Sequence, residues 1–359
     1  METGQPAAVP VARDGAPPGV TAAPFIRSGP AAVLDLARRA DRLGYGSLWV
    51  AEVTGIEAFS VLGAVSQAAP GLGLGTGVLP VQVRTPALLA MAAASVQALA
   101  PDREVLLGVG VSSPVVAGDW HGAGYPAEPL ARMCEFIAVL RECLSGGKVT
   151  FAGDYYQVRG FRLGVELGER RPKIIVGALG GRMLRLAGAQ ADGVLLNYLP
   201  ASHVPWCVEQ VRQGGDATIY ANIHVGVGDR AAADPQARFD LFSYAVVDAY
   251  ASGFERAGFG DAVQAIRAGH LRGDRAGALA AVSKEMVSAI DVVGDAELVR
   301  DTVAAYWNAG STSPSCSLLP GVAVRTLSNR HSRPPSRAGV DVGHFVLEPV
   351  VNQRSQAGT

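Results

Sequence analysis

The sequence has few cysteines, and no pairing pattern among them. The chain of 359 residues contains four dispersed cysteines and no CxxC pair. This spacing excludes a disulfide scaffold and a zinc site built on paired cysteines, and reduced thiols are typical of cytosolic proteins. The four are Cys134, Cys143, Cys207 and Cys316.

Long apolar runs are missing as well. No stretch reaches the roughly 18 uninterrupted apolar residues that a membrane-spanning helix requires. The longest candidate, 87–100, is interrupted by Ser95 and Gln97. The N-terminus lacks the charged-then-apolar order of a secretory signal peptide. We therefore expect a cytoplasmic protein with a flexible leader over residues 1–18, which are rich in Ala and Pro.

Excess charge and aromatic residues are also scarce. The formal net charge is −1, and aromatic residues make up 6% of the chain. Nucleic acids and anionic membranes are bound by basic surfaces, so neither is an expected partner, whereas a small-molecule substrate is. The sequence has no GxSxG or HExxH motif, and its histidines are too scattered for a metal site, so we predict no bound metal.

What the chain does contain is a repeated alternation of buried strands and helices. In the clearest unit, LGLGTGVLP (72–80) leads through a helix into EVLLGVGVSS (104–113). Two buried strands joined by one helix indicate a βαβ unit. Both strands end in glycines and small polar residues, which suits a site built from backbone at the carboxyl ends of the strands.

Eight such strand segments predict a (β/α)8 TIM-type barrel. A doubly wound sheet is the alternative, although nothing marks a reversal of strand order. A hairpin over 148–158 and a mostly helical insertion over 231–289, before the last strand, interrupt the repeat. The predicted strands are 19–24, 46–52, 72–78, 105–109, 173–181, 192–199, 218–228 and 315–319. The predicted outer helices are 31–43, 56–68, 86–99, 129–144, 182–191, 200–214 and 295–309.

The end of the chain departs from this pattern. Residues 321–359 mix Arg, Ser, Pro and Gly and show no apolar stripe that would form an eighth barrel helix. We therefore predict one barrel domain over 19–320, followed by an irregular or disordered tail over 321–359.

Six segments follow one another in a characteristic order. They are LARRADRLGYGSLWVAE, LGTGVLPVQVRTP, LLGVG with DWHG, YYQV, KIIVGALGGRMLRLAG and ADGVLLN. Together, over roughly residues 19–320, they resemble the bacterial luciferase-like flavin-dependent oxidoreductase superfamily, most closely its branch that uses the deazaflavin coenzyme F420. The resemblance implies a barrel with the cofactor ring across its C-terminal mouth, hydride transfer to or from a ring carbon, and commonly a homodimer. The chain departs from these relatives where they form an eighth helix.

The resemblance also implies cofactor-binding positions. Gly77 and Val78 match a non-prolyl cis peptide that backs the ring in F420-dependent relatives; from the residues alone they are a strand-end glycine and a core valine. The segment 177–182 begins a helix whose free N–H groups favour a phosphate, with a glycine-rich turn as the alternative. The predicted cofactor-binding residues are Gly77, Val78, Gly108, Gly110, Ser112, Ser113, Gly177, Ala178, Leu179, Gly180, Gly181 and Arg182.

At the end of the fourth strand, the pattern suits a flat ring. Gly108 and Gly110 lack side chains that would collide with it, and Ser112 and Ser113 would donate hydrogen bonds to its carbonyl groups. For the serines, a plain loop is the alternative.

Two polar residues are predicted to be catalytic. Glu52 ends the second strand, where relatives place an acidic residue or a histidine that orients substrate or moves a proton. Its alternatives are to cap the next helix or to pair with Arg84. His121, beside Trp120, would hydrogen-bond substrate, and a packed loop is its alternative.

Together these features predict an F420-dependent oxidoreductase that transfers a hydride between the deazaflavin and a small organic substrate. An FMN-dependent luciferase-like monooxygenase, which activates oxygen at the reduced ring, is the alternative. A catalytically silent ligand-binding relative is a further alternative, suggested by the unusual tail.

Overall fold

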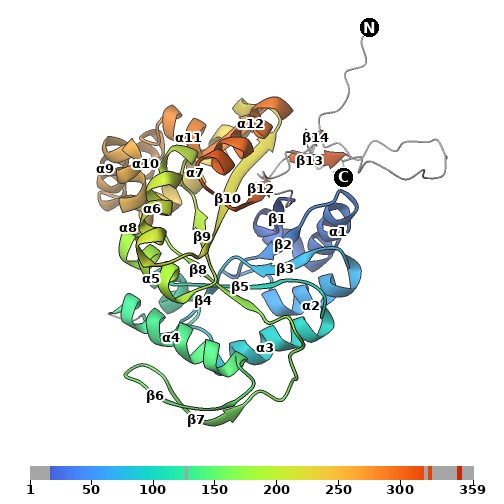
Figure 1. The fold of residues 1–359 in the computed structure, drawn as a ribbon. Helices are drawn as coiled ribbons and strands as arrows, with labels where there is room; N and C mark the ends of the chain where they lie inside the picture. The colour runs from blue at the N-terminus through green and yellow to red at the C-terminus, as the bar shows by residue number, and fades with distance from the viewer. Residues whose placement is uncertain (1–16, 126–127, 319–321, 326–345, 350–359) are drawn as a thin grey trace, which may run out of the picture.

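Eight parallel strands close into a barrel in the computed structural model, which describes residues 17–125, 128–318, 322–325 and 346–349 (Figure 1). Each barrel strand pairs with the next one, and β12 returns to β1, which closes the ring. The predicted (β/α)8 barrel is confirmed. In ring order the strands are β1 (Gly19–Thr21), β2 (Ser47–Val50), β3 (Gly73–Thr76), β5 (Val105–Gly110), β8 (Lys173–Gly177), β9 (Gly193–Asn197), β10 (Thr218–Val227) and β12 (Ser313–Leu318).

Helices surround the barrel (Figure 1). The third of them begins where the sequence predicts, because Pro86 occupies its first turn and the Thr85 hydroxyl accepts a hydrogen bond from the Leu88 N–H group. Within the described residues, no helix follows β12. The outer helices are α1 (Gly29–Arg42), α2 (Ala58–Ala68), α3 (Pro86–Leu99), α4 (Pro129–Leu144), α5 (Gly181–Gln190), α6 (Val204–Gly214) and α12 (Ala296–Asn308), with short helical turns η1 (Ala23–Ser28), η2 (Val115–Trp120) and η3 (Ala201–His203).

Two short strands extend the wall at the C-terminal mouth. β4 (Leu79–Pro80) follows β3 and pairs with β5, and β11 (Asp291–Gly294) pairs with the second half of β10. The sequence did not predict β11. Its four residues lie directly between two helices, where a strand of that length gives no recognisable pattern.

The insertion before the last barrel strand is helical, as predicted. It forms a hydrophobic cluster of its own around Leu241, Phe254 and Met286, and it lies beside α5 and α6 in Figure 1. Its elements are α7 (Arg230–Ala245), α8 (Asp248–Phe254), η4 (Glu255–Phe259), α9 (Gly260–Leu271), α10 (Arg275–Ala280) and α11 (Lys284–Ile290).

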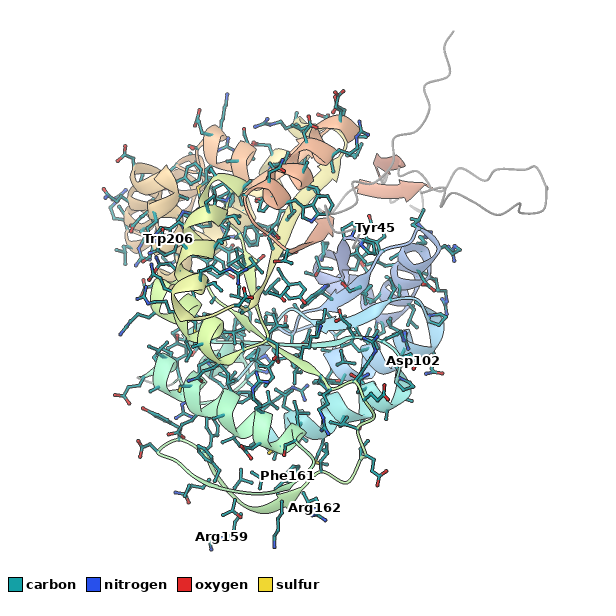
Figure 2. All side chains as sticks on the ribbon, in the orientation of Figure 1. Tyr45, Asp102, Arg159, Phe161, Arg162 and Trp206 are labelled. Atoms are coloured by element: carbon teal, nitrogen blue, oxygen red, sulfur yellow. The ribbon has the colours of Figure 1, made fainter. Side chains whose placement is uncertain are left out.

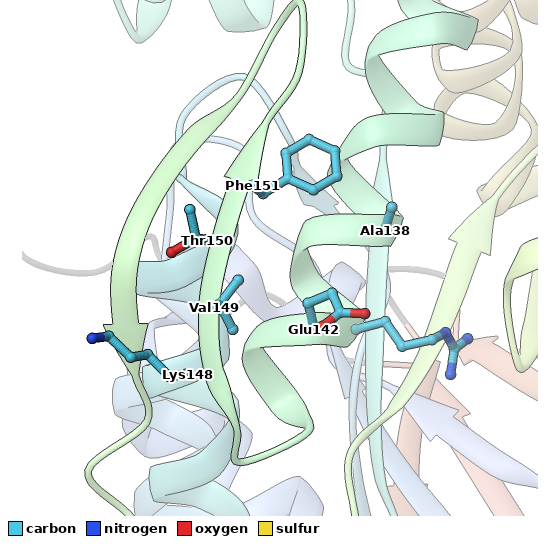
Figure 3. Close-up of a pocket in the computed structure, with 7 residues that line it drawn as sticks. Ala138, Glu142, Lys148, Val149, Thr150 and Phe151 are labelled. Atoms are coloured by element: carbon cyan, nitrogen blue, oxygen red, sulfur yellow. The ribbon is translucent and has the colours of Figure 1, made fainter.

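The predicted hairpin lies outside the barrel and packs over α4. It consists of antiparallel β6 (Lys148–Ala152) and β7 (Gln157–Arg162), and Figure 2 shows Arg159 and Arg162 projecting from its outer edge. Between α4 and β6 is a depression of about 530 Å³, in which Phe151 lies opposite Ala138 (Figure 3). This depression is remote from the mouth, where the site is predicted.

Part of the predicted tail is described. Val322–Arg325 (β13) pairs antiparallel with Val346–Pro349 (β14), while 319–321, 326–345 and 350–359 lie outside the described residues, as do leader residues 1–16. The domain boundaries stay a prediction. In the part of the chain that the structure covers, no helix is both long and apolar enough to cross a membrane. The cytoplasmic location also stays a prediction.

The barrel interior is filled by large side chains packed beside glycines. Trp49 and Tyr220 lie with ring centroids 5.2 Å apart. A methyl group at Gly75 would lie 2.6 Å from the Trp49 ring, so the glycine makes room for the indole. Leu106, Ile175 and Leu195 complete this layer, and Val78 packs on it from the mouth side. The interior is therefore a packed core, and any ligand site must lie above it.

Candidate active site

The centre of the mouth is formed by Val78. The peptide bond between Gly77 and Val78 is cis, and the Val78 side chain lies against glycines of the neighbouring strands. A methyl group on Gly110 would lie 2.7 Å from Val78 Cγ2, and one on Gly177 would lie 3.2 Å from Val78 Cγ1. These residues pack against one another above the core, and we call them the valine platform (Val78, Gly110 and Gly177).

The reason for these glycines differs from the predicted one. From the sequence, Gly108 and Gly110 were predicted to lack side chains because a cofactor ring lies against them. In the structure, Val78 occupies the space beside Gly110, and a methyl group on Gly108 would lie 1.9 Å from the Thr76 carbonyl oxygen. The Thr76 hydroxyl also donates a 2.8 Å hydrogen bond to the Gly108 carbonyl. The glycines therefore allow the close approach of β3 to β5 and the placement of Val78.

Beside the platform, the segment 177–182 leads from β8 into α5. Gly180 is the N-cap residue and no side chain caps the helix, so the first N–H groups of α5 lack acceptors within it. A methyl group on Gly180 would meet nothing within 4 Å, so the backbone here is open to a ligand. Arg182 is exposed in the first turn. Free N–H groups, the helix dipole and a guanidinium together suit an anion.

A second arginine, Arg256 of η4 in the insertion, reaches this segment. Its guanidinium donates a 3.1 Å hydrogen bond to the Leu179 carbonyl and lies 4.7 Å from the centre of the Trp206 ring. The stacked ring and the hydrogen bond fix the position of its charge. We call Gly180, Gly181, Arg182 and Arg256 the anion cradle.

The opposite wall of the mouth is polar. On β9 and β10, the Asn197 side-chain oxygen accepts hydrogen bonds from Asn222 Nδ2 at 2.9 Å and from His224 Nε2 at 3.0 Å. Asn197 Nδ2 in turn donates to the Tyr250 hydroxyl of α8 at 3.2 Å. Since the Asn197 oxygen only accepts, Nε2 of His224 carries the proton and its Nδ1 does not.

Behind this wall, His224 Nδ1 lies 3.7 Å from Asp291 Oδ1, and the Asp291 side chain is fully buried. Neither Asp291 oxygen has a hydrogen-bond partner among the described residues. Burial lowers the pKa of His224 to about 3, and burial, helped by Asp240, raises the pKa of Asp291 well above its ordinary value. Tyr198 stacks on His224 with ring centroids 3.7 Å apart. The low pKa of His224 leaves its ring uncharged at neutral pH, and burial disfavours the charged form of Asp291.

With this geometry established, comparison with known proteins assigns a family. Residues 11–313 match the model described as luciferase-like monooxygenase. The chain belongs to the luciferase-like monooxygenase family.

Among the relatives of this luciferase-like protein is a putative coenzyme F420-dependent oxidoreductase of Mycobacterium tuberculosis, 29% identical over 311 residues, which cover 77% of this chain and 88% of that protein. A 5,10-methylenetetrahydromethanopterin reductase of Archaeoglobus fulgidus is 27% identical over 76% of this chain and 85% of its own length. The solved coenzyme F420 dependent tetrahydromethanopterin reductase from Methanopyrus kandleri shares the fold, with a TM-score of 0.69 and 19% identity over 87% of this chain and 93% of its own.

In this luciferase-like chain, Glu52 both binds the start of the next helix and pairs with Arg84, the two structural roles that were the alternatives to a catalytic one. Its Oε1 accepts hydrogen bonds from the Ala58 N–H group at 2.9 Å and from Arg84 at 2.7 Å. Arg84 also binds Glu57 at 2.5 Å. Partial burial opposes ionisation of Glu57, but hydrogen bonds from Ser60, Phe59 and Arg84 lower its pKa to about 2. Glu52 thus holds Arg84 and the start of α2 at the edge of the mouth.

The remaining predicted residues lie on the segment after β5. The His121 ring nitrogen Nε2 lies 2.6 Å from the Val53 carbonyl oxygen, which links this segment to the loop after β2. Ser112 donates its N–H group to Gln82 at 3.4 Å, and the Ser113 hydroxyl accepts from the Val116 N–H group at 3.2 Å. The Ser112 contact lies between loops and the Ser113 contact is to the first turn of η2, so the predicted hydrogen bonds from these serines to a ring stay a prediction.

Sequence reasoning missed Asn197, His224, Asp291 and Arg256. Asn197 lies in the predicted strand 192–199, and Asn222 and His224 lie in the predicted strand 218–228, but neither strand was predicted to carry site residues. Asp291 lies on the unpredicted strand β11, and Arg256 lies within the insertion. Within the described residues, no group of three or more His, Cys, Asp and Glu side chains could hold a metal ion.

Proposed function

We propose that this protein is an F420-dependent oxidoreductase that transfers a hydride between the deazaflavin and a small organic substrate. The observation that carries the proposal is the anion cradle beside the valine platform, in a chain of this family. The platform offers the apolar Val78 side chain to a ring, and the cradle offers N–H groups and two guanidinium groups to a phosphate arm. When bound, F420 would supply the ring carbon that takes part in hydride transfer.

His121 is the group best placed to move a substrate proton. It is exposed at the rim, and the Val53 carbonyl can only accept a hydrogen bond, so Nε2 carries the ring proton of the neutral histidine. Nδ1 is then an acceptor for a substrate hydroxyl proton. Glu52, with its contacts to Arg84 and Ala58, positions the loop on which Val53 lies.

An FMN-dependent monooxygenase is the second candidate function. It is favoured by the description of the matching family model, luciferase-like monooxygenase. A cradle that binds one phosphate would serve either cofactor, so affinity must separate the two.

Titration of the purified protein with F420 and with FMN, followed by ligand fluorescence, tests the proposal. We expect F420 to bind more tightly than FMN. Replacement of Arg256 by alanine is expected to weaken F420 binding about tenfold or more, because it removes a charge-assisted contact. Arg159→Ala is the matched control, since Arg159 lies on the outer hairpin, remote from the mouth (Figure 2). Preference for FMN, or equal losses in the two variants, would contradict the proposal.

We also propose that the protein forms a homodimer through α2 and α3. Neither helix contains a charged residue, and α3 exposes three large apolar side chains: Leu88 at 50%, Met91 at 49% and Leu99 at 50%. An uncharged apolar surface on two adjacent outer helices suits a second copy of itself, since no complementary charges are needed.

Replacing Met91 by glutamate is expected to convert this dimer to monomer at micromolar concentration, because the charge would be desolvated in the interface. Sedimentation velocity measures the change. The control is Leu271→Glu on α9, where the side chain is 85% exposed, and this variant is expected to stay dimeric. A monomeric unsubstituted protein would refute the assignment of this interface.

A further inference from the structure

The amide groups of Asn197 and Asn222 lie directly above the barrel core. Leu195 and Tyr220 belong to the packed layer inside the barrel. Residues two apart on a strand point to the same face, so Asn197 on β9 and Asn222 on β10 follow this layer on the inner face, nearer the carboxyl ends of their strands. Asn197 is the last residue of β9 and is only partly buried. Its amide is therefore within reach of a ligand at the mouth.

The hydrogen bonds around the Asn197 amide have one direction in the structure. Its Oδ1 accepts from Asn222 Nδ2 and from His224 Nε2, and its Nδ2 donates to the Tyr250 hydroxyl. This direction requires a proton on Nε2 of His224 and leaves Nδ1 bare. A bare ring nitrogen can only accept a hydrogen bond, so the group that faces it has to donate one.

The group that faces Nδ1 is the carboxyl group of Asp291. His224 and Asp291 are register partners on β10 and β11, and Nδ1 lies 3.7 Å from Asp291 Oδ1. When protonated, Asp291 can donate to Nδ1 once this gap shortens to about 3 Å, whereas the ionised carboxylate can only accept. Neither carboxyl oxygen has a hydrogen-bond partner in the part of the chain that the structure describes, so no other hydrogen bond fixes its protonation state.

A second arrangement of the same side chains satisfies the ionised carboxylate. His224 then carries its proton on Nδ1 and donates it to Asp291. The bare Nε2 accepts from Asn197 Nδ2 after that amide rotates by about 180°. Rotation of the Asn222 amide lets its Oδ1, which has no partner in the described structure, accept the second N–H of Asn197. The Tyr250 hydroxyl turns and donates to Asn197 Oδ1. The packing changes little, because amide oxygen and nitrogen have nearly the same size.

We propose that Asp291 is a positioning residue whose ionisation reverses the Asn197 amide, so that an N–H group faces Tyr250 when the carboxyl is protonated and a carbonyl oxygen faces it when the carboxyl is ionised. In this change Asp291 loses one proton to solvent, and the His224 ring stays neutral because its proton only moves from Nε2 to Nδ1. A ligand at this end of the amide meets a donor in the first state and an acceptor in the second. Ligands that accept a hydrogen bond therefore favour the protonated state.

The other titratable groups packed around this pair are tyrosines and one carboxylate. Burial, helped by the Asp240 charge, raises the pKa of Asp291 well above its ordinary value, which moves the change out of the acidic range. Burial also raises the pKa of each tyrosine, so all of them stay protonated while Asp291 titrates. These groups are Tyr198 after β9, Asp240 and Tyr244 on α7, Tyr250 on α8 and Tyr306 on α12.

Nitrogen-15 NMR of the full-length protein labelled on histidine tests the proposal, because a bare ring nitrogen resonates far downfield of a protonated one. His224→Gln identifies the His224 signals. We expect the proton to be on Nε2 at about pH 5 and on Nδ1 at about pH 9, with the ring neutral at both. Asp291→Asn supplies an amide N–H to Nδ1 at every pH, so this variant is expected to keep the proton on Nε2 throughout.

Asp240→Asn is the matched control, since it removes a carboxylate that acts on Asp291 only through its charge. This variant is expected to keep the change of tautomer and to move its midpoint to lower pH. A His224 tautomer that stays constant between about pH 5 and 9 in the unsubstituted protein would overturn the proposal. So would a change of tautomer that persists in Asp291→Asn. The first of these outcomes requires no variant to fold, and neither requires a bound cofactor.

Discussion

Replacing Gly108 by alanine is expected to lower the free energy of unfolding by about 3 kcal/mol or more, at the upper end of the usual range for overpacking. The added methyl group would lie 1.9 Å from the Thr76 carbonyl oxygen and 3.0 Å from the Thr76 carbonyl carbon. Both are backbone atoms of an adjacent barrel strand, so no rotation of a side chain relieves the contact. Urea denaturation measures the loss.

The matched control for this substitution is Gly253→Ala. A methyl group at Gly253 would meet nothing within 4 Å, and the residue lies inside α8. Because alanine is favoured over glycine within helices, this variant is expected to be as stable as the unsubstituted protein or slightly more stable. If Gly108→Ala matched it in stability, the close approach of β3 to β5 would be wrong.

The second large effect concerns the buried pair of His224 and Asp291, whose substitutions are expected to change the pH dependence of stability in opposite directions. Burial lowers the pKa of His224 from 6.5 to about 3, so the unfolded chain binds a proton that the folded chain does not, and stability falls as the pH drops below 6.5. Asp291 has a raised pKa, so its contribution is most favourable below 3.8 and is lost as the pH rises. Each slope is about 1.4 kcal/mol per pH unit.

Above pH 3.8 the two slopes oppose one another in the intact protein, because one group binds an extra proton on unfolding while the other releases one. In Asp291→Asn only the histidine contribution to the pH dependence remains, so the free energy of unfolding should rise with pH from about 4 to 6.5. In His224→Gln only the aspartate contribution remains, so stability should fall as the pH rises above 3.8.

Urea denaturation of both variants at half-unit pH steps from 4 to about 7 checks this pair of predictions. Asp301→Asn is the control, since Asp301 is exposed on α12, and its profile is expected to follow that of the unsubstituted protein. Parallel profiles for Asp291→Asn and His224→Gln would show that the two side chains are not buried in their uncharged forms.

The sequence predicts the barrel well, because strands such as β3, β5 and β8 are almost wholly buried and appear as continuous apolar or glycine-rich runs. The boundaries of α3 and α4 are predicted to the residue, since Pro86 and Pro129 mark their first turns. The strand β11 was missed, because four residues give no periodicity.

The parts of the candidate site that lie within one segment were predicted from the sequence, whereas the parts that distant segments bring together were not. The glycine content of the sequence points to Gly77, Gly110 and the segment 177–182. In the structure, however, Gly110 and Gly177 make room for the Val78 side chain. His224 and Asp291 become neighbours only through the pairing of β10 with β11, and Arg256 meets Leu179 only because the insertion folds back. Contacts between distant segments leave no mark in local sequence patterns.

The pairing of β1 with β12 has a consequence for how the chain is made. Gly19 pairs with Ser315, so β1 cannot pair with β12 until nearly the whole barrel domain has been synthesised. During translation the hydrogen-bonding groups on that side of β1 remain exposed, and the ring cannot close by local contacts alone. Closure of the ring is therefore a late event in folding, and a nascent chain that stalls before β12 would expose an unpaired strand edge at which it could aggregate.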